Sequence, residues 1–235
     1  MTRPSSPVVS PGFFVTGTGT GIGKTLVASA LLRAFALSGM RAIGMKPVAT
    51  GCRADAQDRA NEDVAALIAA SNVSAPIDLV NPYCFAPAIA PHIAARQAGK
   101  AISLMHIRDC FRALASLADR VVVEGAGGLL VPLGPQEDWR DLVSFLELSV
   151  VLVVGMRLGC LNHALLTAEA IRSRGLPFAG WVANSIDSTM PFFEDNLETL
   201  RLKLPAPLIA IMPFAPDNAR ACAAINLDLL VAGNP

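Results

Sequence analysis

The sequence has no net charge and few charged residues of either sign. Its 19 Lys and Arg balance 19 Asp and Glu, and charged residues make up only 16% of the chain. Without an excess of positive charge, the protein has no overall field that would attract nucleic acid or an acidic membrane surface. We therefore expect no nucleic-acid or membrane partner, and any anion must be bound by a local site.

Long apolar runs are also missing, although the mean hydropathy is +0.49. The run from Leu148 to Met156 is too short to cross a membrane, since a spanning helix needs about 20 apolar residues. The segment Met1 to Pro11 is rich in Ser and Pro and lacks the apolar stretch of a signal peptide. We expect residues 1–11 to be a flexible leader and the protein to be cytoplasmic.

The sequence lacks a C-x-x-C pair. The chain has five cysteines, an odd number: Cys52, Cys84, Cys110, Cys160 and Cys222. This pattern favours the reduced thiols of a cytoplasmic protein over a disulfide framework or a zinc site. His106 and Cys110 stand four residues apart on a predicted helix, but two ligands are too few for zinc, so we interpret them as ordinary helix residues.

Short apolar runs are abundant, because 53% of the 235 residues are hydrophobic. Runs rich in Val, Ile and Phe, bounded by Gly or Pro, are typical of buried strands. Six are found: Phe13–Val15, Arg41–Met45, Val121–Val123, Val150–Val154, Phe178–Ala183 and Leu208–Ile211. Such unbroken runs suit a parallel sheet that is buried on both faces.

Helical segments fall between these runs. One extends from Lys24 to Leu37, one begins after a Ser103 cap, and one covers Asn162 to Arg174. Strands that alternate with helices predict an α/β fold with a doubly wound, mostly parallel sheet and helices on both faces. We expect a single domain over residues 12–235, with Pro76 to Pro91 as an excursion from its core.

A phosphate-binding loop follows the first predicted strand, at the sheet edge where such folds bind ligands. The segment from Gly17 to Thr25 resembles a P-loop, whose backbone N–H groups surround phosphate oxygens at a helix N-terminus. Thr18 stands where the strict G-x-x-x-x-G-K-[ST] pattern has glycine. The loop predicts a P-loop NTPase-type fold and these ATP-binding residues: Gly21, Ile22, Gly23, Lys24, Thr25 and Leu26.

Oxygen ligands for Mg²⁺ are the hydroxyl of Thr25 and carboxylates that lie near it. Glu124 ends a very apolar predicted strand, where a charge is costly unless something pairs with it. Asp63 is less clear from the residues alone, because it either caps the helix that follows or binds the metal.

Several further segments, in chain order, make the sequence resemble the dethiobiotin synthetase family. They span residues 13–217, nearly the whole chain, and the lysine, E-G-A-G-G and L-G-C-x-N-H segments are the most specific. The segments are Phe14–Thr18 with Gly23–Thr25, Lys46–Gly51, Asn81–Tyr83, Ala90–His92, Val123–Gly128, Val153–Gly155 with Leu158–Ala164, and Gly180–Asn184.

The resemblance implies a cyclo-ligase that converts 7,8-diaminopelargonate, CO₂ and Mg·ATP to dethiobiotin, ADP and phosphate. One amine captures CO₂ as a carbamate, ATP phosphorylates the carbamate, and the second amine displaces phosphate from the mixed anhydride. Phosphoryl transfer requires mainly positioning and charge neutralisation, which Lys24 and Lys46 would supply together with Mg²⁺.

The resemblance also implies the remaining site residues. Asp63 becomes a magnesium ligand beside Thr25 and Glu124, and Thr50 contacts the diamine, where a relative has serine. The other implied ATP contacts are Gly125, Ala126, Gly127, Asn184, Pro213, Phe214, Ala215 and Asp217. Gly21 stands where a relative has Glu.

A homodimer is implied as well. Family members bind the distal carboxylate of the substrate at a helix N-terminus of the neighbouring subunit, a position that suits an anion. Here this segment consists of Gly159, Cys160, Leu161 and Asn162. The site would then be shared across an isologous interface.

Two alternatives share the P-loop and the carboxylates. One is an ATPase switch of the partitioning or metallochaperone type, and the other is a related ATP-dependent ligase with a different substrate. A switch has no evident need for the segments Lys46–Gly51 and Gly159–His163.

Overall fold

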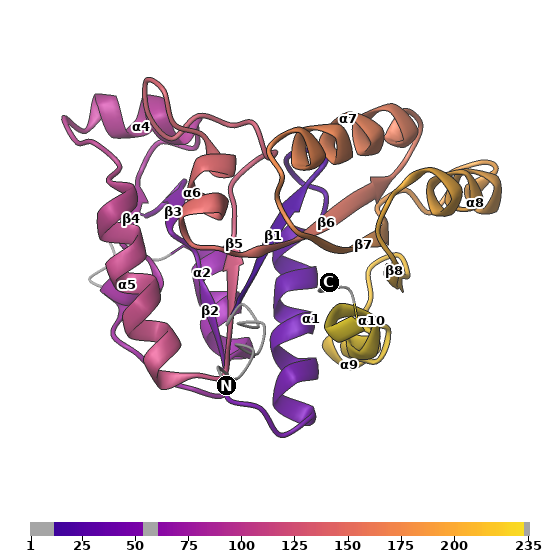
Figure 1. Ribbon diagram of the computed structural model, residues 1–235, viewed down its shortest axis with the longest axis horizontal. Coiled ribbons are helices and arrows are strands. Elements are labelled where there is room, and N and C mark those ends of the chain that lie inside the picture. Colours follow the sequence, from indigo (N-terminus) through magenta and orange to yellow (C-terminus); the bar gives the residue numbers. More distant parts are fainter. Residues whose placement is uncertain (1–11, 54–60, 233–235) are drawn as a thin grey trace, which may run out of the picture.

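A six-stranded parallel sheet forms the centre of the molecule (Figure 1). The computed structural model describes residues 12–53 and 61–232, so the predicted leader, residues 1–11, lies outside the described residues. The strand order is β2-β5-β1-β6-β7-β8, and all neighbouring strands are parallel. The strands are β1 (Gly12–Gly17), β2 (Ala42–Met45), β5 (Arg120–Glu124), β6 (Ser149–Met156), β7 (Phe178–Ser185) and β8 (Leu208–Met212).

All six predicted apolar runs are strands of this sheet. They are recognisable in the sequence because helices cover both faces, so that nearly every residue of a strand is buried. Adjacent residues of β1 face opposite sides, and Phe14 packs in one hydrophobic cluster while Phe13 and Val15 pack in another.

Helices lie on both faces of the sheet, as the alternating pattern predicts. The face bearing Phe13 and Val15 packs against α1, α2, α9 and α10, and the opposite face packs against α5, α6, α7 and α8. The helices are α1 (Lys24–Leu37), α2 (Glu62–Ala70), α3 (Ile77–Val80), α4 (Pro91–Gln97), α5 (Leu104–Leu117), α6 (Trp139–Phe145), α7 (Cys160–Ser173), α8 (Phe193–Lys203), α9 (Asn218–Ala223) and α10 (Leu227–Ala232).

The predicted helix boundaries agree closely with the structure. Helix α1 has the predicted bounds, and the Ser103 hydroxyl caps α5 by accepting the N–H of His106 at 3.3 Å. Helix α7 begins at Cys160, two residues before the predicted start, because Gly159 adopts a left-handed conformation (φ 91°) that turns the chain into the helix.

A second, two-stranded sheet lies outside the main one and was not predicted. Strand β3 (Val48–Thr50) pairs in parallel with β4 (Tyr83–Phe85), which places part of the 76–91 excursion beside the segment that follows Lys46. These strands have three residues each and are held by pairing between distant parts of the chain, so no local pattern marks them.

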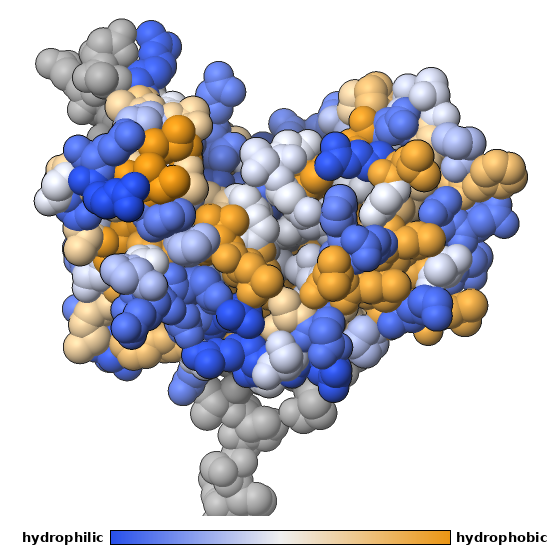
Figure 2. Space-filling view, turned by 90° about the horizontal axis from the view of Figure 1, so that it is seen from above, coloured by the Kyte–Doolittle hydropathy of each residue, from blue (hydrophilic) through white to orange (hydrophobic). Residues whose placement is uncertain are grey.

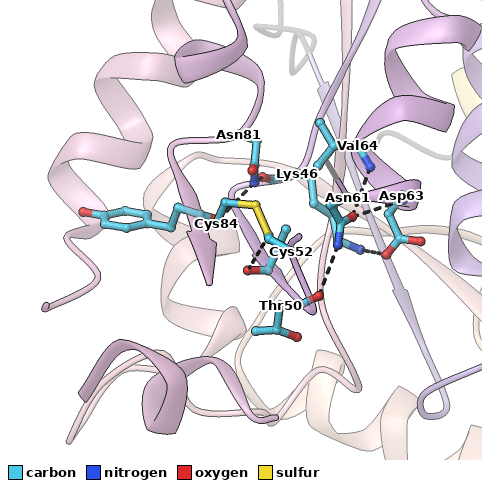
Figure 3. The surroundings of a disulfide bond; sticks show 10 residues. Lys46, Thr50, Cys52, Asn61, Asp63, Val64, Asn81 and Cys84 are labelled. Carbon is cyan, nitrogen blue, oxygen red and sulfur yellow. Dashed lines mark hydrogen bonds and ion pairs between the residues drawn. A yellow bond between two sulfur atoms is a disulfide. The ribbon is translucent and has the colours of Figure 1, made fainter. Parts of the chain in front are cut away.

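A disulfide joins Cys52, two residues beyond the end of β3, to Cys84 of β4, so the expectation of reduced thiols is wrong for these two residues (Figure 3). The pairing of β3 with β4 brings the Cα atoms of Cys52 and Cys84 to 6.0 Å, a separation that a disulfide spans. The two cysteines are 32 residues apart in sequence. Cys110, Cys160 and Cys222 are free and buried.

His106 and Cys110 lie on α5 with ring nitrogen and sulfur 4.0 Å apart. Residues 12–53 and 61–232 contain no group of three or more His, Cys, Asp or Glu side chains able to hold a metal. Within the same ranges, no helix combines the length and apolarity that crossing a membrane would require.

Candidate active site

A cavity of about 740 Å³ opens at the carboxyl edge of the sheet. Figure 2 looks onto this edge and shows the surface hollowed between two raised sides. Ten predicted site residues line the cavity: Gly21, Gly23, Lys24, Thr25, Lys46, Thr50, Asp63, Glu124, Ala126 and Gly127. The cavity therefore lies where parallel α/β sheets bind their ligands.

The P-loop connects β1 to α1 at one side of this cavity. Gly23 has φ 87°, and a Cβ atom there would lie 2.1 Å from Nδ2 of Asn184, so only glycine fits. Asn184 Nδ2 donates to the carbonyl of Ile22 at 2.7 Å, and Lys24 Nζ donates to the carbonyl of Gly19, also at 2.7 Å. The loop is thus held in shape from within the protein.

Lys46 and Glu124 meet because their strands are neighbours. Strand β2 pairs with β5 in a register that sets Met45 opposite Val123, so the next residue of each strand emerges at the same point of the edge. The ammonium of Lys46 lies 2.6 Å from Glu124 Oε1 and 3.3 Å from the carbonyl of Gly125. Both side chains are almost completely buried, with 3% and 1% of their area exposed.

Asp63 joins this pair from the first turn of α2. Its Oδ2 lies 2.8 Å from Lys46 Nζ, and its Oδ1 lies 2.8 Å from Thr25 Oγ1 (Figure 3 shows the contact with Lys46). Asn61, not Asp63, is the N-cap of α2, because its side chain accepts the N–H groups of Asp63 and Val64. The carboxylate of Asp63 is thereby left to face the cavity.

The hydroxyl of Thr25 is shared between two acids. It lies 2.8 Å from Glu124 Oε1 as well as from Asp63 Oδ1, and its single proton can be donated to only one of them at a time. Two lysines, two carboxyl groups and one hydroxyl thus gather at one end of the cavity.

Burial and mutual charge shift the pKa values of these groups. Burial, with help from the charge of Lys46, lowers the pKa of Lys24 to about 8. Burial by itself also lowers the pKa of Lys46, but Glu124 and Asp63 outweigh it and hold the pKa above the usual lysine value. Burial raises the pKa of Glu124. Burial also acts to raise the pKa of Asp63, but Lys46, with Thr25 and Lys24, outweighs it and lowers that pKa.

The donor set fits a magnesium ion. Glu124 Oε2 is buried and has no hydrogen-bond partner among the described residues, although its neighbour Oε1 is fully engaged. A hard cation with one or two carboxylates, a hydroxyl, phosphate oxygens and waters matches the oxygen chemistry of Mg²⁺. Thr25, Asp63 and Glu124 would supply the protein's share of those oxygens.

Other predicted residues lie away from the cavity walls in this chain. Phe214 is exposed, Ala215 has φ 45°, and Asp217 Oδ1 caps α9 by accepting the N–H of Arg220 at 2.8 Å. Predicted residues that do not line the cavity are Ile22, Leu26, Gly125, Gly159, Cys160, Leu161, Asn162, Asn184, Pro213, Phe214, Ala215 and Asp217.

Some lining residues had no predicted role. These are Thr20, Ala88, Ile89, Ala90, Pro91 and Val131. The segment 88–91 forms an apolar part of the wall, and its last two residues belong to the Ala90–His92 segment that the family resemblance singles out. That segment was the available signal, but its role depends on how the 76–91 excursion folds back to the site.

The fold and the P-loop define a nucleotide-binding α/β protein of the P-loop class. The chain superposes on a chain of the MinC:MinD cell division protein complex from Aquifex aeolicus with a TM-score of 0.53 and 15% identity, covering 95% of this chain and 86% of that one. A ParA family ATPase from Chlorobium tepidum gives 0.52 and 13% identity, with 96% and 90% covered. At such low identity these likenesses show the fold alone.

Curated relatives are much more similar in sequence. An ATP-dependent dethiobiotin synthetase BioD from Nitrosospira multiformis is 54% identical over 86% of this chain and 88% of its own length. One from Pseudomonas paraeruginosa is 49% identical over 95% and 98%, and a family model described as an AAA domain matches residues 11–221. The chain belongs to the ATP-dependent dethiobiotin synthetase family.

Proposed function

We propose that the protein is an ATP- and Mg²⁺-dependent cyclo-ligase that converts 7,8-diaminopelargonate and CO₂ to dethiobiotin in biotin biosynthesis. The observation that carries this proposal is the placement of Lys46 between Asp63 and Glu124, beside the P-loop Lys24 and Thr25. Relatives at 47–54% identity that bear the dethiobiotin synthetase name support the same reaction.

The P-loop would hold the phosphates of ATP. Lys24 and the loop amides would neutralise the β- and γ-phosphates, and Thr25, Asp63 and Glu124 would hold Mg²⁺. When bound, this ion would neutralise phosphate charge that otherwise repels the incoming carbamate oxygen. Gly21 to Leu26 and Gly125 to Gly127 would contribute backbone contacts around the same phosphates.

Lys46 would act on the reacting groups. Its ammonium lies at the edge of the cavity beside the magnesium ligands, where it would stabilise the negative charge shared between the carbamate and the transferred phosphoryl group. Thr50 lines the same cavity and would hydrogen-bond an amine of the substrate. The apolar wall formed by 88–91 would pack against the alkyl chain.

The adenine would lie toward Asn184 and the segment Pro213–Ala215, with Asp217 nearby. The side-chain amide of Asn184 donates one hydrogen to the carbonyl of Ile22. Its other hydrogen and its own side-chain oxygen would be left for the base. Phe214 is 53% exposed and would be covered in part when a base binds.

A homodimer would complete the substrate site. The N-terminus of α7, residues Gly159 to Asn162, does not line this chain's cavity, so a second copy would have to supply it for the distal carboxylate. Exposed apolar residues lie before and on α7 (Leu158 and Leu166) and before and on α8 (Phe192 and Leu202), and would be covered by such contacts. A cytoplasmic location remains a prediction from the sequence.

The test is the substrate dependence of ADP formation. Purified protein should form ADP and dethiobiotin only when diaminopelargonate, bicarbonate and Mg²⁺ are all present. ATP turnover that does not depend on the diamine would instead favour the partitioning-type switch, which the named relatives do not support. ADP formation with another diamine or amino acid, but not with diaminopelargonate, would identify the related-ligase alternative.

A further inference from the structure

Asn81 is a fully buried polar residue next to the site, and it has no role in the chemistry described above. It follows α3, none of its side-chain area is exposed, and its own N–H donates to the carbonyl of Ile77 at 2.7 Å. Its amide nitrogen donates to two carbonyls, that of Lys46 at 2.5 Å and that of Tyr83 at 3.0 Å. Figure 3 shows the Asn81 side chain directed at the backbone of Lys46.

Among the described residues, both hydrogen bonds of the Lys46 backbone are made with this segment. The N–H of Lys46 donates to the carbonyl of Val80 at 2.8 Å, and its carbonyl accepts from Asn81. Pro47 follows and has no N–H to donate. The direction in which the Lys46 side chain leaves the backbone is therefore fixed by residues 80 and 81, at the point where the chain departs from the main sheet.

Lysine needs such support because its stem is flexible. The side chain has four carbons joined by rotatable bonds between the backbone and the ammonium. That ammonium lies within hydrogen-bond distance of both Asp63 and Glu124. Because only 3% of the Lys46 side chain is exposed, the buried side chain has little room to compensate for a shift of its backbone.

Burying Asn81 carries a cost in free energy. Its Oδ1 is buried and accepts no hydrogen bond from the described residues, and such an orphaned group typically costs about 1–3 kcal/mol. The surrounding cluster is apolar and includes Val80, Phe85 and Ala94. Against this cost, the amide nitrogen of Asn81 satisfies two backbone carbonyls, those of Lys46 and Tyr83.

We propose that Asn81 is the positioning residue for Lys46, whose ammonium it aims at the reacting groups by fixing the Lys46 carbonyl. The inference rests on the proposed function of Lys46. It predicts that Asn81 controls the chemical step without taking part in nucleotide binding, because none of its hydrogen bonds reaches the P-loop.

Asn81→Ala tests this, and Asn72→Ala is the matched control. Asn72 makes equivalent bonds at the other end of β2, where it accepts the N–H of Ala42 at 2.7 Å and donates to the carbonyl of Met40 at 2.9 Å. We expect Asn81→Ala to lower kcat for diamine-dependent ADP formation between about 10- and 100-fold, as displaced catalytic groups do. The Kd for ADP should stay within about threefold of wild type, and Asn72→Ala should leave kcat within about twofold.

A second measurement reports on Lys46 without any substrate. Acetic anhydride acetylates unprotonated, accessible amines, and mass spectrometry can follow Lys46 relative to the exposed Lys203. We expect Lys46 to be protected in wild type and in Asn72→Ala, and to react at least about tenfold faster in Asn81→Ala, since a displaced ammonium loses its burial and its acidic partners.

Should Asn81→Ala fail to fold, Asn81→Ser replaces it, because serine retains one donor for the Lys46 carbonyl and should give intermediate losses. Unchanged kcat and unchanged Lys46 protection in a folded variant would overturn the inference, as would a loss of thermal stability alone. If the wild-type protein itself lacks diamine-dependent turnover, the proposed function fails, and the acetylation result still decides the role of Asn81.

Discussion

Lys24 is the residue at which pH should act on nucleotide binding. Its pKa of about 8 in the nucleotide-free protein means that it loses its charge as the pH rises through about 8. Phosphate favours the charged form, so the pKa is higher in the complex, and the affinity falls by up to about tenfold per pH unit between the two values. Calorimetry with a non-hydrolysable ATP analogue between about pH 7 and pH 9.5 measures this fall.

Lys24→Arg is the control for that measurement, because a guanidinium keeps its charge throughout this range. Its affinity for the analogue should be independent of pH above about 7.5, whatever its absolute value. A wild-type affinity that stays constant up to pH 9.5 would show that Lys24 is not the titrating phosphate partner.

The interaction between the buried Lys46 and Glu124 should be measurable as a change in the free energy of unfolding. Lys46→Met removes the ammonium and leaves Glu124, with 1% exposure, without that partner, which typically lowers the free energy of unfolding by about 3–5 kcal/mol. Lys46→Met/Glu124→Gln removes both charges and should recover much of this loss. Urea denaturation of the single and double variants measures the difference, and equal losses would contradict the coupling.

The sign of the pH effect in Lys46→Met follows from Glu124. Burial already raises the pKa of this carboxyl, and without Lys46, which lowers it, the pKa rises further. The folded state then binds more protons than the unfolded state, so the stability of Lys46→Met relative to wild type decreases as the pH rises above the usual pKa of a glutamate, about 4.5. Lys46→Met/Glu124→Gln should lack this dependence.

Among the elements, β3 and β4 form a short sheet of three paired residues each, and a covalent link lies beside it. The Cys52–Cys84 disulfide joins positions 32 residues apart, and closing a loop of that size in the unfolded chain corresponds to about 3–4 kcal/mol in the chain-entropy model. We expect Cys52→Ser/Cys84→Ser to be less stable than the oxidised wild type by about 2–4 kcal/mol.

Reductant provides the matched control for this prediction. It should lower the stability of wild type toward that of Cys52→Ser/Cys84→Ser and leave the variant unchanged. Under denaturing, non-reducing conditions the oxidised wild type should show the three thiols of Cys110, Cys160 and Cys222. Five titratable thiols in freshly purified protein would mean that the bond had not formed.

The elements also show how far the sequence could predict this structure. Strands β1, β5 and β6 are evident in the sequence because burial on both faces makes them continuous apolar runs. Strands β3 and β4 are not, because three-residue strands depend on partners from elsewhere in the chain. The disulfide was missed for the same reason, since cysteine spacing carries no record of which strands pair.

Site residues divide in the same way. Lys24 and Thr25 follow from a local motif, whereas the residues alone left Asp63 undecided between cap and ligand until the structure placed Asn61 as the cap. Asn81 has a recognisable sequence context but no local sign of its bond to Lys46, which arises where the excursion meets the end of β2.

At the scale of the whole molecule, one chain does not bring the N-terminus of α7 to its own cavity, so the proposed site needs two. Lys46→Ala would inactivate the site of its own chain, and Asn162→Asp would put a negative charge where the partner's substrate carboxylate binds. A mixed dimer then has one site with both residues intact, so an equal mixture with free exchange should regain about a quarter of wild-type activity.

The activity regained by the mixture distinguishes a site shared between two chains from two independent sites. If each chain used its own Lys46 and its own Asn162, every site in the mixture would carry one of the two changes, and no activity would return. Each parent variant must be inactive alone, and subunit exchange must be shown by co-purification of differently tagged chains. Under those conditions a mixture that stays inactive excludes the shared arrangement, because the α7 N-terminus of one chain would then have no part in the chemistry of the other.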